Sequence, residues 1–193
     1  MAKELNKVFF EIIIAPSFDG GALSLFSKKK NLRVLSLGKY RPKKSFGKEI
    51  AGGWVIQETD LSKISASKLK TVTKKAPTKA QLSSLSLAWK AVKHTKSNAV
   101  VVAYNKKIIS ISGGQTSRVD AVKYGLTKTR VPAGAVLASD AFFPFRDSVD
   151  LMAKYKIKSI IQPGGSIKDK EVIEACDKHG ISMVFTGTRV FKH

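Results

Sequence analysis

The residues best suited to bind a ligand are densest at positions 139–147, which read Ser-Asp-Ala-Phe-Phe-Pro-Phe-Arg-Asp. An apolar, strand-like run (135–138) precedes this stretch and a helix-like segment (148–154) follows it. We therefore expect an aromatic, charged loop at the end of a strand, where open α/β sheets build their sites. Aromatic side chains stack on flat rings, and a carboxylate accepts hydrogen bonds from ring N–H groups. The stretch predicts a pocket for a flat heteroaromatic ligand.

Two glycine-containing turns and the chain end could complete such a pocket. Residues 113–118 read Gly-Gly-Gln-Thr-Ser-Arg, and residues 162–169 read Gln-Pro-Gly-Gly-Ser-Ile-Lys-Asp. A Gly pair before a helix can turn backbone N–H groups toward an anion. Strand-to-helix turns also use Gly for backbone reasons alone, so the pattern by itself is weak. The last nine residues, 185–193, add an Arg at position 189.

The elements that position these loops can be predicted from hydrophobic periodicity. In the first 76 residues we expect a buried strand at 8–14, a helix capped by Asp19 and running to residue 28, and short strands at 32–37 and 52–57. Residues 38–48 read as a basic loop, and residues 60–76 as a surface connector. These residues are predicted to form the N-terminal strands, helix and basic connector of one lobe.

Residues 77–193 are predicted to form the main α/β part of the same lobe. Thr78 is placed to cap a long helix, in which apolar residues recur at helical spacing: Leu82, Leu85, Trp89 and Val92. The apolar run 99–103 reads as a central strand that pairs with 106–111 across a turn at 104–105. A helix from 117 to about 124, then strands alternating with helices up to a final strand at 181–185, predict an α/β sheet with helices on both faces.

Composition narrows the class of protein. The 193 residues carry a net charge of +21, spread along the chain but denser in its first 80 residues. Such a surface attracts anions, which include nucleic acid, a nucleotide monophosphate and a polyglutamylated folate; a merely solvated lysine-rich surface is the alternative. No apolar run reaches membrane length, and no secretory signal is recognisable at the start. One cysteine, Cys176, excludes an internal disulfide. We expect a soluble, cytoplasmic protein.

Several ordered motifs together resemble one protein family. They are residues 97–99, 113–118, 139–147, 162–169 and 185–193. In these, the chain resembles the C-terminal half of the transformylase domain of the bifunctional purine biosynthesis protein. That domain is an AICAR formyltransferase, which follows an IMP cyclohydrolase domain. The likeness runs from about Phe9 to His193 and is strongest after Pro77. It implies a cytidine-deaminase-like, three-layer α/β/α fold with a mixed central sheet and no zinc site.

The resemblance also implies ligand contacts. Its AICAR-binding residues correspond to Asn98, Phe142 and Arg189. Its folate-binding residues correspond to Arg118, Asp147, Ser166 and Ile167. The formyl donor implied is 10-formyltetrahydrofolate, with no metal. The chain departs mildly from the family pattern at Ser112, Gly113 and Thr116, before the Arg, and at Ser148, after the Asp.

Each of these residues also has a plain structural interpretation. Asn98 could satisfy backbone groups at a helix–strand junction, and the Phe residues could be core, with Arg146–Asp147 a local ion pair. Asp169 could serve only to begin a helix. The three histidines, His94, His179 and His193, are more typical of structural or solvated positions than of catalysis. Zinc-deaminase chemistry is excluded because the chain lacks a Cys-x-x-Cys and a His followed two positions later by Glu.

The resemblance assigns no catalytic residue to this chain. The family's catalytic Lys-His pair and its phosphate-binding Arg-Tyr segment lie in a half that has no counterpart here; Lys93-His94 stands in a different context. Formyl transfer needs a base for the amine and a donor for the oxyanion. Three interpretations follow: one subunit of a split transformylase whose partner chain supplies that half, an excised domain, or a diverged relative that binds without turnover.

Two classes of function therefore remain at this stage. The first is a formyltransferase lobe that binds AICAR and folate, acts in purine (IMP) biosynthesis, and works as a homodimer or with a partner chain. The alternative is a non-catalytic module that binds nucleotide, folate or nucleic acid on the same fold. Free formate used with ATP is a second possible donor, although no Gly-x-x-x-x-Gly-Lys phosphate loop is present.

Overall fold

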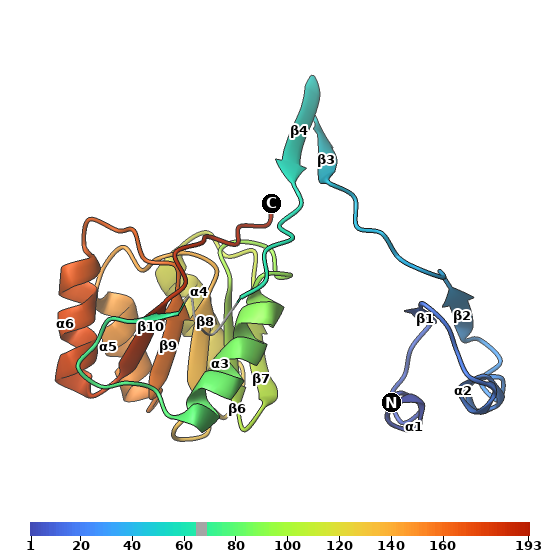
Figure 1. Cartoon of the computed structure of the whole chain (residues 1–193), viewed down its shortest axis with the longest axis horizontal. Helices are drawn as coiled ribbons and strands as arrows, with labels where there is room; N and C mark the ends of the chain where they lie inside the picture. Colours follow the sequence, from blue (N-terminus) through green and yellow to red (C-terminus); the bar gives the residue numbers. More distant parts are fainter. Residues whose placement is uncertain (65–68) are drawn as a thin grey trace. The chain divides into compact units, whose positions relative to one another are not determined.

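The computed structural model describes residues 1–64 and 69–193, which divide into two compact units, Met1–Thr59 and Asp60–His193. This division differs from the predicted one at 76/77, because β5 (Lys70–Thr71) pairs with the last strand of the main sheet. The predicted surface connector 60–76 thus contributes a strand; its residues 65–68 lie outside the described part. Figure 1 traces the chain from its N-terminus to its C-terminus.

The unit Met1–Thr59 contains short elements and little core. Its elements are α1 (Ala2–Leu5), β1 (Ile12–Ala15), α2 (Gly20–Phe26), β2 (Arg33–Ser36), β3 (Ser45–Ile50) and β4 (Gly53–Glu58). β1 and β2 form a two-stranded parallel sheet, and β3 and β4 form a two-stranded antiparallel hairpin. In this fully described unit, Phe26 is the only buried residue.

Some predictions for this unit are confirmed and others are wrong. Asp19 caps α2, because its Oδ1 accepts a hydrogen bond from the Ala22 N–H at 2.6 Å, although the helix ends at Phe26. The strand expected at 8–14 begins only at Ile12, and it is partly exposed where burial was predicted. The basic loop predicted at 38–48 gives way to β3 at Ser45, because β4 pairs with it along its whole length.

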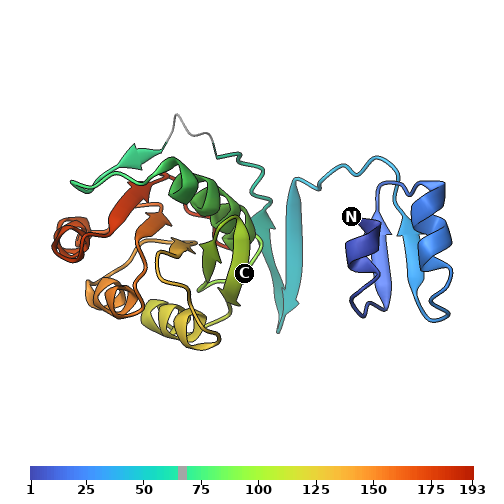
Figure 2. The same ribbon diagram turned by 90° about the horizontal axis from the view of Figure 1, so that it is seen from below.

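The unit Asp60–His193 is built on a six-stranded mixed sheet with the order β5-β10-β9-β8-β6-β7. Besides β5, its elements are α3 (Lys79–Val92), β6 (Val100–Tyr104), β7 (Lys107–Ser112), α4 (Arg118–Thr127), β8 (Val136–Ser139), α5 (Asp147–Lys154), β9 (Ser159–Gln162), α6 (Asp169–His179) and β10 (Ser182–Phe185). Figure 2 shows α3 on one face of the sheet and α4, α5 and α6 on the other. The predicted three-layer α/β/α fold with a mixed sheet is confirmed.

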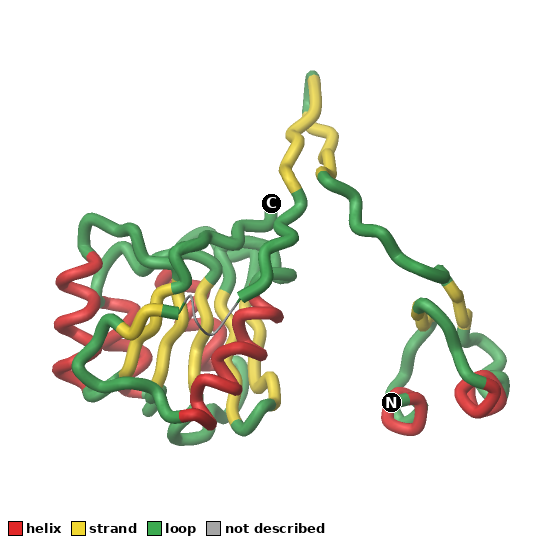
Figure 3. Tube along the Cα trace, viewed as in Figure 1, coloured by secondary structure: helices red, strands yellow, loops and turns green. Residues whose placement is uncertain are grey.

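Successive side chains along a strand point to opposite faces of the sheet, and this alternation explains why the core has two layers. Alternate β6 residues face opposite ways: Val100 and Val102 pack with α4, α5 and α6, whereas Val101 packs under α3 beside Leu85 and Trp89. A strand that is buried on both faces reads as a continuous apolar run, as residues 99–103 do. In Figure 3 the strands of this unit lie side by side between helices.

Local signals set several boundaries as predicted. The Thr78 side chain accepts a hydrogen bond from the Gln81 N–H, and the Gln81 side chain accepts one from the Thr78 N–H, so α3 begins with a capping box. The β6–β7 turn lies one residue later than expected, at Asn105 and Lys106, which have φ of 46° and 59°. Positive φ at both central residues suits the twist of a tight hairpin.

Among the described residues, no helix has the length and apolar character needed to cross a membrane.

Candidate functional site

Strand directions bring the five predicted motifs to one edge of the main sheet. β8, β9 and β10 run parallel, so the loops after Ser139, Gln162 and Phe185 leave the same edge. β6 runs antiparallel to β8, and its first residue, Val100, is paired with Ser139 on one side and with Ser112 on the other. The start of β6 and the end of β7 therefore lie at this edge as well. We call this end of the sheet, where the parallel strands β8, β9 and β10 terminate, the carboxyl edge.

A buried ion pair lies at the centre of this edge. The Asp140 carboxylate is fully buried and contacts the Arg118 guanidinium, whose side chain is 6% exposed. The other Asp140 oxygen accepts a 2.5 Å hydrogen bond from the Ser97 hydroxyl, and Oδ1 also accepts one from the Ala99 N–H at 3.0 Å. Burying a charge is costly unless it is paired and hydrogen-bonded, and this carboxylate meets both conditions.

Arg118 is the first residue of α4, and the sequence predicted it to contact folate. Its Nη1 donates to the Ala99 carbonyl and the Ser139 hydroxyl at 3.0 Å each, besides the bond to Asp140. Its Nη2 donates to Asn98 Oδ1 at 3.0 Å. In this structure both Nη atoms are therefore engaged within the chain, and a contact with folate stays a prediction.

Asn98 lies two residues before the start of β6, at the junction that the sequence indicated. Its amide Nδ2 donates to the backbone carbonyls of Gln115 at 3.0 Å and Thr116 at 3.4 Å, while its Oδ1 accepts from Arg118. The structural role of satisfying backbone groups is therefore present. Through these bonds Asn98 ties the start of β6 to the glycine-containing turn before α4.

That turn has a packing reason for its glycine. A Cβ at Gly113 would lie 2.4 Å from Thr95 Cγ2 and 2.9 Å from the Lys96 carbonyl oxygen. Because real Cβ contacts are longer than this, a side chain at Gly113 would displace the segment before Asn98. The turn is consequently shaped by the close approach of the α3–β6 connection, a constraint that does not depend on any ligand.

Phe142 and Arg189 form a second contact pair on the same edge. The Arg189 guanidinium carbon lies 4.7 Å from the centroid of the Phe142 ring, within the range of a cation–π interaction. Phe142 is half-buried and Arg189 is exposed. The structure thus brings together two of the three residues predicted to contact AICAR, and it leaves a partly accessible aromatic face beside a cation.

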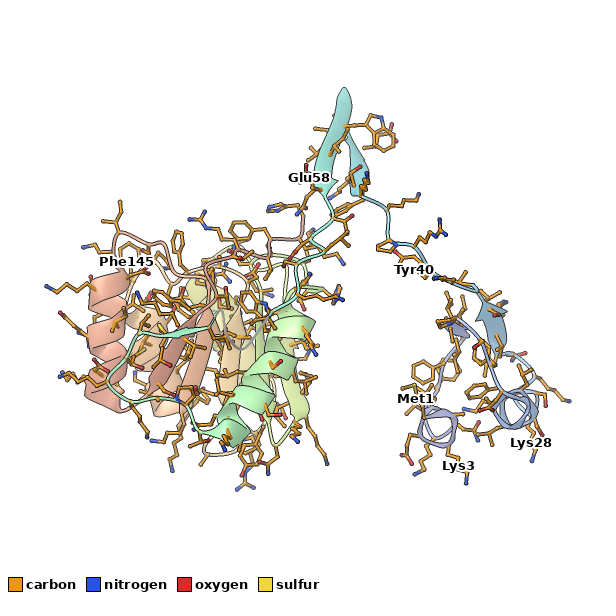
Figure 4. The ribbon with its side chains drawn as sticks, in the orientation of Figure 1. Met1, Lys3, Lys28, Tyr40, Glu58 and Phe145 are labelled. Carbon is orange, nitrogen blue, oxygen red and sulfur yellow. The ribbon has the colours of Figure 1, made fainter. Side chains whose placement is uncertain are left out.

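The remaining aromatic residues of the 139–147 loop divide between core and surface. Phe143 is fully buried with the α4–α6 layer, as the structural interpretation expected, whereas Phe145, labelled in Figure 4, is 56% exposed. The proposed Arg146–Asp147 ion pair is wrong. Arg146 instead binds Asp150, one helical turn on, through two hydrogen bonds of 2.9 and 3.1 Å. Asp147, exposed at the first position of α5, accepts a 2.6 Å bond from the Ser148 N–H.

The loop after β9 approaches its neighbours closely. Gly164 has a φ of +76°, and a Cβ there would lie 2.5 Å from the Phe185 ring. Two residues on, Ser166 is half-buried and accepts a hydrogen bond from the Lys168 N–H at 3.1 Å, while Ile167 is fully exposed. Asp169 begins α6 and accepts a bond from the Gly165 N–H at 2.7 Å, which supports the structural role considered for it.

The last residues of the chain are fixed across the carboxyl edge. The Val190 N–H donates to the Asp140 carbonyl at 3.1 Å, and the Val190 side chain is buried under α3. The Lys192 N–H donates to Ser97 Oγ at 3.1 Å, and the Ser97 N–H donates to the Lys192 carbonyl at 2.9 Å. These bonds hold Arg189 next to the Phe142 loop.

The structure also identifies residues that sequence reasoning missed. Asp140 and Ser97 connect the start of β6, α4, the end of β8 and the C-terminal segment. From the sequence, Asp140 is one member of the 139–147 motif and has no predicted role of its own. An acidic residue directly after an apolar strand, together with an Arg at the start of a helix, could have suggested a buried pair, but nothing in the sequence specifies which residues meet.

A second cluster of charges joins α5 to α6. Asp150 lies between Arg146 and His179, whose Nε2 is 2.7 Å from Asp150 Oδ1. The hydrogen bonds from Arg146, and next those from His179, hold the pKa of the Asp150 carboxyl well below its usual value. His179 is therefore a link between two helices, as expected of a structural histidine. Within the described residues, no group of three or more His, Cys, Asp or Glu side chains is arranged to hold a metal ion.

The chain belongs to the AICARFT/IMPCHase bienzyme family, whose model matches residues 1–128. It is 50% identical over 196 residues to the bifunctional purine biosynthesis protein PurH of Aquifex aeolicus, with all of this chain and 38% of that protein covered. The corresponding protein of Magnetococcus marinus is 45% identical over 208 residues, with 100% of this chain and 39% of the relative covered. The chain thus spans well under half the length of these relatives.

One solved structure shows a limited likeness. It is a diaminohydroxyphosphoribosylaminopyrimidine deaminase/5-amino-6-(5-phosphoribosylamino)uracil reductase from Thermotoga maritima, with 20% identity and a TM-score of 0.35. The alignment covers 55% of this chain and 35% of that one.

Proposed function

We propose that this chain is the C-terminal lobe of an AICAR formyltransferase, which binds AICAR and 10-formyltetrahydrofolate for formyl transfer to the AICAR 5-amino group. The observation that carries the proposal is the meeting of all five motifs at the carboxyl edge, which follows from the strand register. Membership in a family of bifunctional purine biosynthesis proteins supports the same conclusion.

The proposed AICAR contacts are Asn98, Phe142 and Arg189. A half-buried ring stacked against a guanidinium offers a flat surface for a five-membered heteroaromatic ring and a cation for its carboxamide oxygen or phosphate. The amide of Asn98 can both donate to and accept from a carboxamide, once it exchanges a bond to the neighbouring backbone for one to the ligand.

The proposed folate contacts are Arg118, Asp147, Ser166 and Ile167. The residues at this edge suit the group: Asp147 is an exposed carboxylate that can accept two hydrogen bonds from an amino-pyrimidinone, and Ile167 is a fully exposed apolar side chain. When bound, 10-formyltetrahydrofolate supplies the formyl carbon. In this proposal Asp147 orients the pterin edge, and Arg118 contacts the folate while it also holds the segment that carries Asn98.

Formyl transfer requires a base for the amine and a donor for the oxyanion, and the family's Lys-His pair has no counterpart in the five motifs that meet at the carboxyl edge. We infer that a partner chain with the family's Lys-His half supplies the base and the oxyanion donor, and that the active assembly is either this pair or a dimer of it. The single chain should then bind ligand and show little or no turnover.

Calorimetry with the full chain and AICAR tests binding directly. We expect saturable binding that Phe142→Ala weakens at least tenfold and that exposed Phe145→Ala, the matched control from the same loop, changes little. Absence of AICAR binding to both the chain and its partnered form would refute the proposal. Salt-sensitive binding of RNA that AICAR and folate do not displace would favour the nucleic-acid module instead. Strong formyl transfer by the single chain would refute the need for a partner.

A further inference from the structure

Gln162 is a polar side chain at the end of a central, apolar strand. It is the last residue of β9 and is fully buried. Among the described residues, its side-chain Nε2 donates only to Met183 Sδ, at 3.4 Å, and a thioether is a weak acceptor. Burying an amide group is costly unless its hydrogen bonds are made. The reason for a glutamine here therefore lies in the contact made by its oxygen.

The Gln162 oxygen holds the first glycine of the loop that joins β9 to α6. Its Oε1 accepts a 2.8 Å hydrogen bond from the Gly164 N–H. Gly164 is itself buried, has a φ of +76°, and lies against the Phe185 ring. A buried N–H in such a turn costs free energy if it is left unpaired. Gln162 supplies its acceptor from inside the core.

Asp169 closes the same loop from its other end. Its Oδ2 accepts a 2.7 Å hydrogen bond from the Gly165 N–H, four residues earlier. The Lys168 N–H donates to Ser166 Oγ at 3.1 Å, and the Asp169 N–H donates to the Ser166 carbonyl at 3.1 Å. We call residues 163–168 the β9–α6 turn, which Figure 1 shows between these two elements.

These bonds leave two adjacent backbone donors at the apex of the β9–α6 turn. The N–H groups of both glycines point into the chain, so they do not form a cradle for an anion. Ser166 and Ile167 are the residues of the turn whose N–H groups have no acceptor among the described residues. These two are also the residues of this turn that the sequence predicted to contact folate. The closure of the turn thus determines which groups it presents.

We infer that Gln162 and Asp169 are positioning residues for the folate: neither touches it, and together they hold the turn that presents Ser166 and Ile167. The inference rests on the proposed function, which assigns the folate contact to those two residues. A turn that is free to adopt other conformations binds more weakly, because only the competent fraction of molecules takes up the ligand.

Gln162→Met tests the core contact, because it nearly conserves the volume of the side chain and removes the oxygen acceptor. Calorimetry with the full chain would use 5-formyltetrahydrofolate, a stable folate with the same amino-pyrimidinone ring. We expect its affinity to fall about tenfold, while AICAR affinity changes less than about twofold. Hydrogen–deuterium exchange of the Gly164 amide, followed by NMR, should accelerate about tenfold or more.

The matched control is Thr73→Val. Thr73 is also buried, and its hydroxyl accepts a 2.8 Å hydrogen bond from the Met183 N–H, away from the β9–α6 turn. This variant also deprives a buried backbone N–H of its acceptor with little change of volume. It should lower stability as Gln162→Met does, and it should leave the affinity for 5-formyltetrahydrofolate unchanged. The comparison separates positioning from a general loss of stability.

Asp169 provides a second, independent pair of variants. Asp169→Ala removes the acceptor of the Gly165 N–H, whereas Asp169→Asn keeps an oxygen for it. Both remove the charge at the start of α6, so their difference isolates the hydrogen bond. We expect Asp169→Ala to weaken binding of 5-formyltetrahydrofolate about fivefold or more and Asp169→Asn to stay within about twofold of wild type. Because Asp169 is only half-buried, this pair decides the question even if Gln162→Met does not fold.

Four results would overturn the inference. They are unchanged exchange of the Gly164 amide in Gln162→Met, an equal loss of folate affinity in Thr73→Val, an equal loss of AICAR affinity in Gln162→Met, and equal binding by the two Asp169 variants. Failure of the proposed function looks different, since wild type would then bind neither AICAR nor the folate. The folate role would fall with it, and the exchange of the Gly164 amide would still decide whether Gln162 holds the turn.

Discussion

Removing the charge of Asp140 tests the central feature of the carboxyl edge. Asp140→Asn keeps the shape of the side chain but leaves the Arg118 guanidinium, 6% exposed, without its counter-ion. Breaking a buried pair by neutralising one partner costs about 3–5 kcal/mol. The Asn oxygen can still accept from the Ala99 N–H, and its NH2 group can donate to the Ser97 hydroxyl oxygen, so the lower end of this range, about 3 kcal/mol, is expected.

Urea unfolding followed by fluorescence measures this loss. Trp89 is 4% exposed in the main unit and reports on its core, whereas Trp54 lies in the other unit and is replaced by Phe in every variant. We expect Asp140→Asn to lower the unfolding free energy by about 3 kcal/mol with an unchanged slope. The matched control, Glu174→Gln on the exposed side of α6, should stay within about 0.5 kcal/mol.

A double variant separates loss of the charge pair from simple loss of packing. Arg118→Met removes the buried cation, so Asp140→Asn with Arg118→Met should be less destabilised than the sum of the single variants. Two results would show that the Arg118–Asp140 ion pair does not organise the carboxyl edge. One is a loss of unfolding free energy below about 1 kcal/mol for Asp140→Asn, and the other is a loss in the double variant that equals the sum of the two single losses.

Three further predictions concern single positions. Gly164→Ala should lower the free energy of unfolding by about 2–3 kcal/mol, because the added Cβ would collide with the Phe185 ring. The control is Gly180→Ala, which is also at positive φ but faces open space and should cost about 1 kcal/mol. Equal losses in urea unfolding would exclude the collision. Asp150→Asn should cost less than about 1 kcal/mol, because the ion pair with Arg146 is partly exposed. Since the folded pKa of Asp150 is depressed, this difference from wild type should be present above about pH 4 and shrink as pH falls below it; a pH-independent difference would contradict the assignment. Burial raises the pKa of Cys176 to about 12, so its thiol should resist alkylation at pH 8 until the chain unfolds, and rapid labelling of folded protein would refute this.

The sequence predicted the structure well wherever the local sequence signal was strong. The helix cap at Thr78, the doubly buried run at 99–103 and the strand–helix alternation after residue 117 each depend on neighbouring residues, and each was found. The strand at 8–14 was placed too early and expected to be buried. Its apolar residues satisfy a strand pattern, but burial depends on what covers the strand, and β1 alternates between exposed and half-buried residues.

The sequence by itself determined most elements of residues 77–193, the α/β class and the motifs by which the chain resembles its family, but it did not predict β3 or β5. Only the tertiary structure decided which residues meet. Periodicity reports which side of an element is apolar, but the order β5-β10-β9-β8-β6-β7 is set by long-range pairing that no local pattern encodes. That order makes Asp140 the partner of Arg118, and it places Arg189 over Phe142 from the far end of the chain. A buried charge must find its counter-ion in space, and the distance along the sequence does not constrain that choice.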